Sequence, residues 1–223
     1  MPAGRILNSV SMMCADFLHL ESDLGLFGEV GVDFLHIDVM DGHYVPNFAL
    51  GTDFCRQLDA ASPIPLDVHL MVEEPERWIE RFAFKNSLIS FHPDTSRHPL
   101  RTMEAIRNAG SHPGIALDPS IPPEQYRYLM AEADFILIMA VNPGYAGQKL
   151  IPSALDKIRE TRAYIDGHSD HPIHIEVDGN VSWDHIPAMV SAGADILVTG
   201  TSSIFAKDLS RKEALEKFNR LVR

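Results

Sequence analysis

The stretch FLHIDVM, residues 34–40, decides how the rest of the sequence is interpreted. Side chains alternate between the two faces of a β-strand, so the aliphatic residues at positions 35, 37 and 39 share one face. His36, Asp38 and Met40 share the other face. The apolar face can pack against helices, and the polar face must then point into the interior of a sheet. Because imidazole and carboxylate groups are costly to bury, this strand predicts a site.

The same alternation of a short β-rich run with an amphipathic stretch occurs eight times along the chain. The predicted strands are Ile6–Met12, Phe34–Met40, Leu66–Met71, Leu88–His92, Gly114–Leu117, Phe135–Ala140, Ile173–Asp178 and Ile196–Thr199. The predicted helices are residues 15–30, 53–61, 74–83, 99–110, 123–133, 152–165, 182–193 and 210–223. Several of these begin after Pro, Asp or Ser, and two end at Gly. Eight units without a linker-like break predict an α/β fold, a single-domain (β/α)8 TIM barrel over residues 1–223, with its site at the carboxyl ends of the strands.

The bulk composition is that of an ordinary globular protein, with 223 residues, 45% of them hydrophobic and 22% charged. A net charge of -12 argues against a general surface for nucleic acid or anionic membrane, because either needs clustered Lys and Arg. No apolar stretch approaches the roughly 20 residues that span a bilayer, and the N-terminus lacks a signal-peptide core. We therefore expect a cytoplasmic protein. Cys14 and Cys55 are too few for a disulfide scaffold, and we expect both to be buried free thiols.

Two further strands carry polar residues on the face that the barrel would enclose. In "LDVHLM" these include His69, and in "IHIEVD" they include Asp178. If they converge with His36 and Asp38, two imidazole nitrogens and two carboxylates become available to a divalent cation such as Zn²⁺, Fe²⁺ or Mn²⁺. The alternative is a hydrogen-bonded polar layer that fills the barrel.

Three more polar residues lie deeper on the same faces, namely Asp67, His174 and Glu176. For these residues we expect the polar layer. Asp41 follows the second strand, and we expect it to form hydrogen bonds within the loop instead of binding a metal.

The second and seventh strands lie nearly opposite each other in an eight-stranded barrel, so Asp38 and Asp178 could approach a substrate from opposite sides. One carboxylate on each face of a carbon is what inversion of a stereocentre by proton removal and return requires. A metal that contacts the ketone and hydroxyl oxygens would stabilise the enediolate between the two steps.

Six ordered blocks of the sequence resemble the ribulose-phosphate 3-epimerase family, essentially over the whole chain. They are "VSMMCADF", "HIDVMDGHYVPN", "DVHLMV", "MAVNPGYAGQKLIP", "IEVDGN" and "AGADILVTGTSSIF". The resemblance implies a TIM-barrel isomerase that interconverts ribulose 5-phosphate and xylulose 5-phosphate with one divalent metal ion, Zn²⁺, Fe²⁺ or Mn²⁺, with Co²⁺ also acceptable.

The resemblance also implies roles for individual residues. The metal ligands correspond to His36, Asp38, His69 and Asp178, and the acid/base pair to Asp38 and Asp178. The substrate contacts correspond to Ser11, Met40, His69, Met71 and Met139. We expect the phosphate in glycine loops after the later strands, at Gly144, Tyr145, Ala146, Gly147, Gly179, Asn180, Gly200, Thr201 and Ser202.

The sequence departs from the family pattern at Val10 and Ala146, at Asn180 in place of a second glycine, and in "GTSS". Close relatives that epimerise allulose 6-phosphate at C3 share "Met-Cys", "AGQ" and "GTS", so a six-carbon substrate is the alternative. A lyase of the hexulose-phosphate synthase type is disfavoured, because no Lys or Arg occupies the inward faces. A non-catalytic sugar-phosphate-binding barrel is the remote third alternative. Relatives are commonly homo-oligomers, and the sequence leaves the oligomeric state open.

Overall fold

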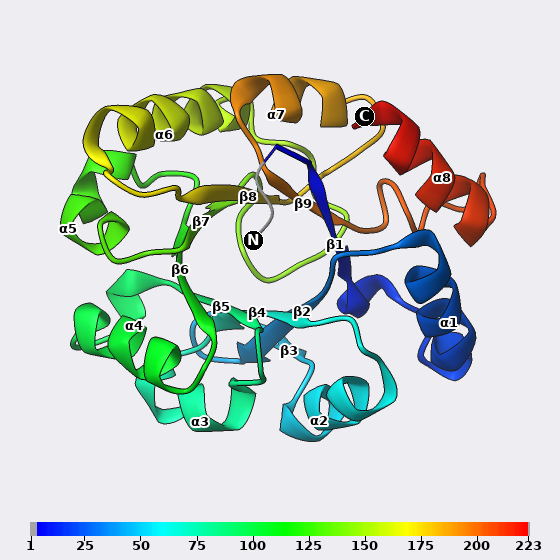
Figure 1. Cartoon of the computed structure of the whole chain (residues 1–223), viewed down its shortest axis with the longest axis horizontal. Coiled ribbons are helices and arrows are strands. Elements are labelled where there is room, and N and C mark those ends of the chain that lie inside the picture. Colours follow the sequence, from blue (N-terminus) through cyan, green and yellow to red (C-terminus); the bar gives the residue numbers. More distant parts are fainter. Residues whose placement is uncertain (1–3, 223) are drawn as a thin grey trace.

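Eight parallel strands close into a barrel, within residues 4–222 that the computed structural model describes (Figure 1). The barrel strands are β1 (Leu7–Ser11), β2 (Phe34–Asp41), β4 (Leu66–Met71), β5 (Leu88–Phe91), β6 (His112–Leu117), β7 (Phe135–Met139), β8 (His174–Asp178) and β9 (Ile196–Thr199). Each strand is hydrogen-bonded to the next, and β1 pairs with both β9 and β2, which closes the ring. The predicted (β/α)8 barrel is confirmed.

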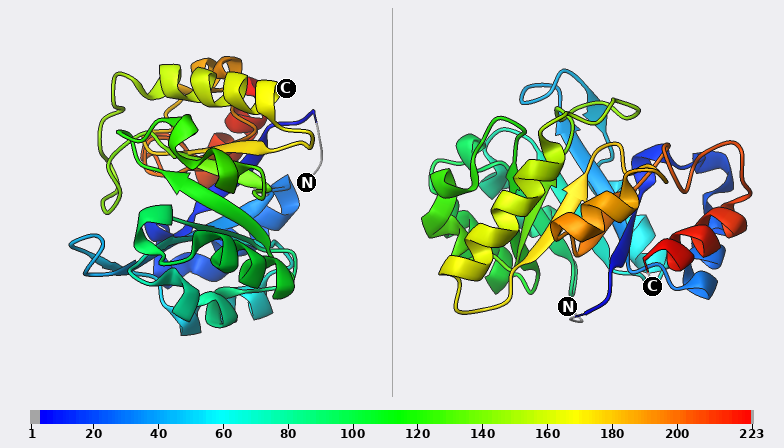
Figure 2. Two further views of the ribbon diagram at one scale, coloured as in Figure 1. Left: turned by 90° about the vertical axis from the view of Figure 1, so that its left-hand side faces the viewer. Right: turned by 90° about the horizontal axis from the view of Figure 1, so that it is seen from above.

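An outer ring of helices surrounds the barrel (Figures 1 and 2). The helices are α1 (Leu20–Val30), α2 (Thr52–Ala61), α3 (Ile79–Phe82), α4 (Pro99–Asn108), α5 (Arg127–Met130), α6 (Ala154–His168), α7 (Ile186–Ala192) and α8 (Arg211–Leu221). Short 3-10 helices cover Met12–Cys14, Phe17–His19, Pro75–Arg77, Pro93–Thr95 and Pro123–Tyr126. All eight helical regions expected from the sequence are therefore present.

Several helices begin later than the sequence predicts. The regions predicted at 74–83 and 123–133 each start as a 3-10 turn with proline in its first turn, and only four residues of each become α-helical. In the first case Glu74 precedes the turn with a φ of 52°, a left-handed conformation that cannot belong to the helix. The region 182–193 becomes helical only from Ile186, with a proline in the first turn. Hydrophobic spacing predicts these segments but does not locate their first turn.

The two larger apolar cores lie on opposite sides of the barrel wall. The larger lies between strands and helices and includes Leu35, Ile37 and Val39 of β2. The smaller lies in the barrel interior and consists of Leu7, Phe34, Leu88, Ala116, Phe135, Leu137, Met139 and Ile196. The two faces of β2 therefore separate as the alternation predicts, which leaves the polar inward residues above the smaller core.

Two loops meet over the carboxyl end of the barrel (Figure 2). A two-residue strand, β3 (Phe48–Ala49), which the sequence did not predict, folds back antiparallel on the end of β2. The loop between them contacts the loop after β7, because the Asn47 amide donates to the Gly144 carbonyl at 2.9 Å and the Tyr145 hydroxyl donates to the Pro46 carbonyl at 3.3 Å. These contacts form one rim of the mouth.

Candidate active site

Four side chains converge at the carboxyl end of the barrel interior, namely His36, Asp38, His69 and Asp178. One ligand atom from each lies within 4.8 Å of those of the others. The register explains part of this, because Asp38 of β2 pairs with His69 of β4. Asp178 is the last residue of β8 and reaches the cluster from that strand. Residues far apart in the sequence are thus brought together as predicted.

Unpartnered nitrogen atoms show that this cluster is suited to a cation. His36 Nε2 and His69 Nδ1 are buried and have no hydrogen-bond partner among the described residues. They lie 3.5 Å and 3.6 Å from the same oxygen, Asp38 Oδ1. Buried polar atoms without partners are unfavourable, and imidazole nitrogens with carboxylate oxygens are the donors that transition-metal dications prefer. The residues present therefore fit one divalent metal ion.

The two carboxylates of the cluster have opposite electrostatic surroundings. Burial alone raises the pKa of Asp38, but the imidazoles of His36 and His69 outweigh burial and hold this pKa well below its usual range. Burial and then the charge of Asp38 raise the pKa of Asp178 to about 6. The Ser11 hydroxyl also donates to Asp38 Oδ2 at 3.3 Å. Environments that push two carboxyl pKa values apart are typical of an acid/base pair.

A second polar cluster lies directly beneath the first. Asp67 Oδ2 accepts from the Ser9 hydroxyl at 2.6 Å and contacts His36 Nδ1 at 2.7 Å. Burial and the charge of Asp67 raise the pKa of Glu176 well above its usual value, which favours the neutral form of this carboxyl group. The predicted hydrogen-bonded layer is confirmed for Asp67. Glu176 is buried beside it, but neither of its carboxyl oxygens has a hydrogen-bond partner among the described residues. His174 lies lower, partly exposed and 3.8 Å from Asp195, and so does not belong to the layer.

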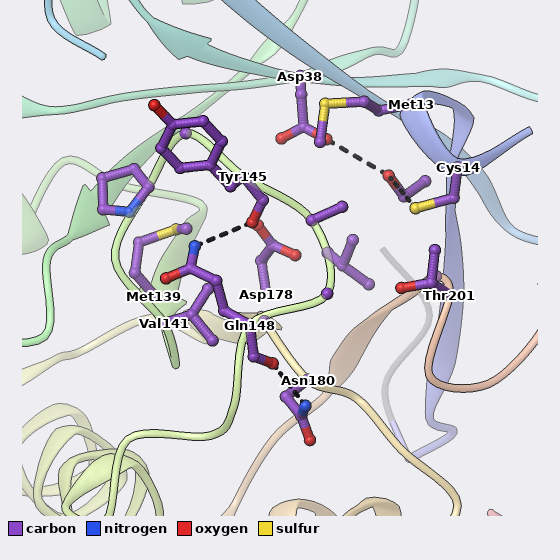
Figure 3. Close-up of a pocket in the computed structure, with 18 of the residues that line it drawn as sticks. Met13, Cys14, Asp38, Met139, Val141, Tyr145, Gln148, Asp178, Asn180 and Thr201 are labelled. Carbon is purple, nitrogen blue, oxygen red and sulfur yellow. Dashed lines mark hydrogen bonds between the residues drawn. The ribbon is translucent and has the colours of Figure 1, made fainter. Parts of the chain in front are cut away.

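A cavity opens above the carboxylates, and Figure 3 shows Asp38 and Asp178 at its wall. Predicted substrate contacts that line the cavity are Ser11, Met40, Met71, Met139, Gly144, Tyr145, Ala146, Gly147, Gly179, Asn180, Gly200, Thr201 and Ser202. His36 and His69 are fully buried below it. Sequence reasoning missed Met13, Cys14, Val141, Asn142, Pro143, Gln148, Val181 and Val198, which also line it. Most of these residues follow the end of a strand. There the alternation of side chains between the two strand faces no longer predicts which way a side chain points.

Asn180, at a position where the family resemblance implies glycine, adopts a φ of 48° and connects two rim loops. Its amide donates to the Gln148 carbonyl at 2.6 Å (Figure 3). Its Oδ1 lies 3.0 Å from His185 Nδ1. Gln148 in turn donates to the carbonyls of Asn142 and Tyr145. The asparagine side chain is therefore bonded to the neighbouring loop, and the left-handed backbone that the glycine would allow is retained.

The two cysteines have different surroundings. Cys55 is buried, as expected, but Cys14 is half-buried and lines the cavity, with its thiol 3.7 Å from the Ser11 hydroxyl. The expectation of burial is thus wrong for Cys14, because the short 3-10 helix after β1 brings it to the mouth.

Asp41 bonds within the loop, as predicted. Its Oδ1 accepts from the backbone N–H groups of His43 and Tyr44, and its Oδ2 accepts from that of Glu73. Burial raises the pKa of Asp41, but these three donors outweigh burial and lower the pKa. Asp41 therefore ties the loop after β2 to the loop after β4.

Sequence reasoning also missed three residues next to the cluster, namely Tyr44, His92 and Asp118. His92 Nε2 lies 2.9 Å from His69 Nε2, and His92 Nδ1 lies 3.2 Å from Asp118 Oδ1. The Tyr44 hydroxyl donates to Asp118 Oδ2 at 2.9 Å. The alternation that singled out His69 could have found His92 and Asp118, because they continue the inward faces of β5 and β6. Tyr44 lies in the loop after β2, where alternation makes no prediction.

In residues 4–222, the structure contains no helix with the length and apolar character needed to cross a membrane.

Among known protein families, the profile described as the ribulose-phosphate 3 epimerase family matches residues 8–205 of this chain.

Curated relatives share about two fifths of the residues over most of the chain. A ribulose-phosphate 3-epimerase of Cupriavidus necator is 42% identical over 202 residues, which is 89% of this chain and 84% of the relative. The ribulose-phosphate 3-epimerase of Escherichia coli K12 is 42% identical over 203 residues, 90% of this chain and 89% of the relative. That of Bacillus subtilis is 38% identical over 208 residues, 93% of this chain and 95% of the relative.

Solved structures share the barrel at much lower identity. A 3-hexulose-6-phosphate synthase superposes with a TM-score of 0.67 at 15% identity, covering 99% of this chain and 100% of the other. A tryptophan synthase α-subunit of Pyrococcus furiosus superposes with a TM-score of 0.65 at 15% identity, covering 97% of each chain. At this identity the likeness concerns the fold alone.

Proposed function

Because the chain belongs to the ribulose-phosphate 3-epimerase family, we propose that it interconverts D-ribulose 5-phosphate and D-xylulose 5-phosphate by inverting C3. The family is one of isomerases, so the chain is an epimerase. The observation that carries the proposal is the pair Asp38 and Asp178, which reach one cavity from β2 and β8 with oppositely shifted pKa values.

Asp38 and Asp178 can together transfer protons at C3 of the substrate. An ionised carboxylate on one face removes the C3 proton, and the electron pair moves toward C2 to give an enediolate. The opposite carboxyl group, which is protonated, then delivers a proton to the other face of C3. The first group is left protonated and the second ionised, so the reverse reaction starts from the state in which the forward reaction ends. The two aspartates exchange roles with the direction of the reaction.

His36, Asp38, His69 and Asp178 would hold one divalent cation, Zn²⁺, Fe²⁺, Mn²⁺ or Co²⁺. When bound, the cation supplies electrostatic stabilisation for the negative charge that develops on the substrate's C2 and C3 oxygens. The unpartnered His36 Nε2 and His69 Nδ1 atoms are the evidence that these residues fit a cation. Ser11 orients the Asp38 carboxylate through their hydrogen bond.

Three methionines enclose the position where the enediolate would form, namely Met40, Met71 and Met139. Their side chains are nearly fully buried and carry no acidic proton. They exclude water that would otherwise return a proton to either face without stereochemical control. We therefore assign them an enclosing role and no acid/base role.

We place the phosphate in the loops Gly144–Gly147, Gly179–Asn180 and Gly200–Ser202, all of which border the cavity. Backbone N–H groups of glycine-rich loops after the later strands of such barrels are suited to an anion. The bonding of the Asn180 amide to the Gln148 carbonyl supports a rim of fixed shape.

The test is a comparison of kcat/KM on D-ribulose 5-phosphate and D-allulose 6-phosphate. We expect the five-carbon substrate to be preferred, and a preference for the six-carbon substrate would assign the chain to the alternative activity. Asp38→Asn and Asp178→Asn should each lower kcat by at least about 10²-fold. Asp59→Asn, on the exposed surface of α2, makes the same chemical change away from the site and should leave kcat unchanged.

A cytoplasmic location and the absence of nucleic-acid or membrane partners remain predictions from the sequence, which leaves the oligomeric state open. The proposed substrate is a small phosphorylated ketose.

A further inference from the structure

A line of three side chains extends from His69, and none of the three lines the cavity. It consists of His92 after β5, Asp118 after β6 and Tyr44 in the loop after β2. His92 is 1% exposed, and the Tyr44 ring lies against it with ring centroids 4.7 Å apart. The Lys157 ammonium group donates to the carbonyls of Leu117 and Asp118, which fixes the end of β6. The line is therefore held from several sides.

The metal site requires one particular tautomer of His69. Its Nδ1 is buried, has no hydrogen-bond partner and faces Asp38 Oδ1 at 3.6 Å. A nitrogen can bind a metal only through a free lone pair, so Nδ1 must carry no proton. The proton of the neutral ring is then on Nε2, which must donate to His92 Nε2 across 2.9 Å.

The tautomer of His69 determines the tautomer of His92 as well. Because His92 Nε2 accepts, the proton of the neutral His92 ring is on Nδ1, which lies 3.2 Å from Asp118 Oδ1. That contact is off the N–H axis, and Asp118 Oδ1 has no hydrogen-bond partner elsewhere in the described chain. An ionised carboxylate only accepts, and the second oxygen of Asp118 already accepts from the Tyr44 hydroxyl at 2.9 Å. The donors of His69, His92 and Tyr44 thus all lie on the side of the next group in the line, which ends at the Asp118 carboxylate.

The other ligand imidazole shows the same arrangement in a shorter form. His36 presents Nε2 to Asp38, while its Nδ1 contacts the Asp67 carboxylate directly at 2.7 Å. Both imidazoles of the metal cluster are therefore backed by a carboxylate, one directly and one through a second imidazole. Such partners fix the tautomer and orientation of metal-binding histidines.

On the basis of the proposed function, we propose that His92, Asp118 and Tyr44 are positioning residues that hold His69 in its metal-binding tautomer and so set the affinity of the metal site. None of the three is a metal ligand or touches the reacting atoms. Their effect on turnover is exerted through His69.

The test measures Zn²⁺ and Co²⁺ affinity by competition with a chromophoric chelator, without substrate. His92→Leu and Asp118→Ala remove an acceptor and should weaken binding about 10- to 100-fold. His92→Gln and Asp118→Asn are matched controls, because their side-chain carbonyl oxygens can still accept the hydrogen bond and should restore most of the affinity. Tyr44→Phe keeps the ring over His92 and should have the smallest effect.

A second measurement uses the ¹⁵N shifts of labelled histidine in the chelator-treated protein, which distinguish protonated from unprotonated ring nitrogens. In the wild type we expect Nδ1 of His69 to be unprotonated, and in Asp118→Ala we expect a mixture of tautomers. A folded Asp118→Ala protein with wild-type affinity and a single tautomer would overturn the inference. So would an Asp118→Asn protein as weak as Asp118→Ala, since charge and not hydrogen bonding would then be responsible.

The inference and the proposed function fail in different ways. If the wild type binds the metal and epimerises C3, but the variants bind equally well, only the positioning role is lost. If the wild type neither binds the metal nor epimerises either ketose phosphate, the proposed function itself is wrong.

Discussion

Substitution of Gly179, the residue after Asp178, should be strongly destabilising. Its φ is +111°, where side chains are strained, and a Cβ built there would lie 2.6 Å from Val141 Cγ2 and 2.9 Å from the Val141 backbone nitrogen. The conformational strain costs about 1–3 kcal/mol. Forced repacking against Val141 adds about 1–3 kcal/mol. We therefore expect Gly179→Ala to lower the free energy of unfolding by about 2–6 kcal/mol, a large share of the stability of a typical domain.

The assay is urea unfolding followed by circular dichroism, with the free energy extrapolated to water. Gly167→Ala is the matched control, because Gly167 is exposed in the last turn of α6 and a Cβ there meets no atom within 4 Å. Gly167→Ala should leave the free energy of unfolding unchanged or raise it by up to about 1 kcal/mol. A Gly179→Ala protein within about 0.5 kcal/mol of the wild type would refute the reasoning.

Three further predictions concern other parts of the chain. Ser210→Ala removes the capping box that Ser210 and Glu213 form at the start of α8, and should cost about 1 kcal/mol in urea unfolding; an unchanged midpoint would show that the cap contributes nothing. Asp41→Asn should destabilise at neutral pH, because the lowered pKa of Asp41 means that its carboxylate stabilises the fold above the unfolded pKa of about 3.9. The difference in the free energy of unfolding between Asp41→Asn and the wild type should disappear as the pH falls through the folded pKa of Asp41. A difference that does not depend on pH would contradict this prediction. Removal of the metal by a chelator should lower Tm, with recovery on adding Zn²⁺, since binding at about 100 Kd contributes about 2.7 kcal/mol; an identical Tm would argue against a cation at the cluster.

The architecture and the central cluster were predictable because both depend on simple periodicities. Alternation along β2 distinguishes the inward His36 and Asp38 from the outward Ile37, and it does so without knowledge of the partner strands. Repetition of strand and helix then closes the barrel and brings the carboxyl ends together. The four residues of the metal cluster follow from these two facts.

The parts that were not predicted lie where periodicity ends. The turns that precede α3 and α5 are 3-10 because the local backbone geometry at Glu74 and the prolines determines them, and hydrophobic spacing does not reveal this geometry. Cys14 reaches the cavity through a 3-10 turn for the same reason. Alternation extends to His92 and Asp118, but the contact of Tyr44 with Asp118 joins a loop to a distant strand end, and only the folded structure shows it.

The most direct test of the account is C3 inversion by the metal-loaded enzyme in deuterated water. D-ribulose 5-phosphate is incubated, and the configuration and deuterium content at C3 of the product are determined by NMR and mass spectrometry. With Asp38 and Asp178 acting on opposite faces, the inverted product should carry deuterium at C3. Inverted product without solvent deuterium, or no exchange and no inversion with either the five- or the six-carbon ketose phosphate, would contradict the account.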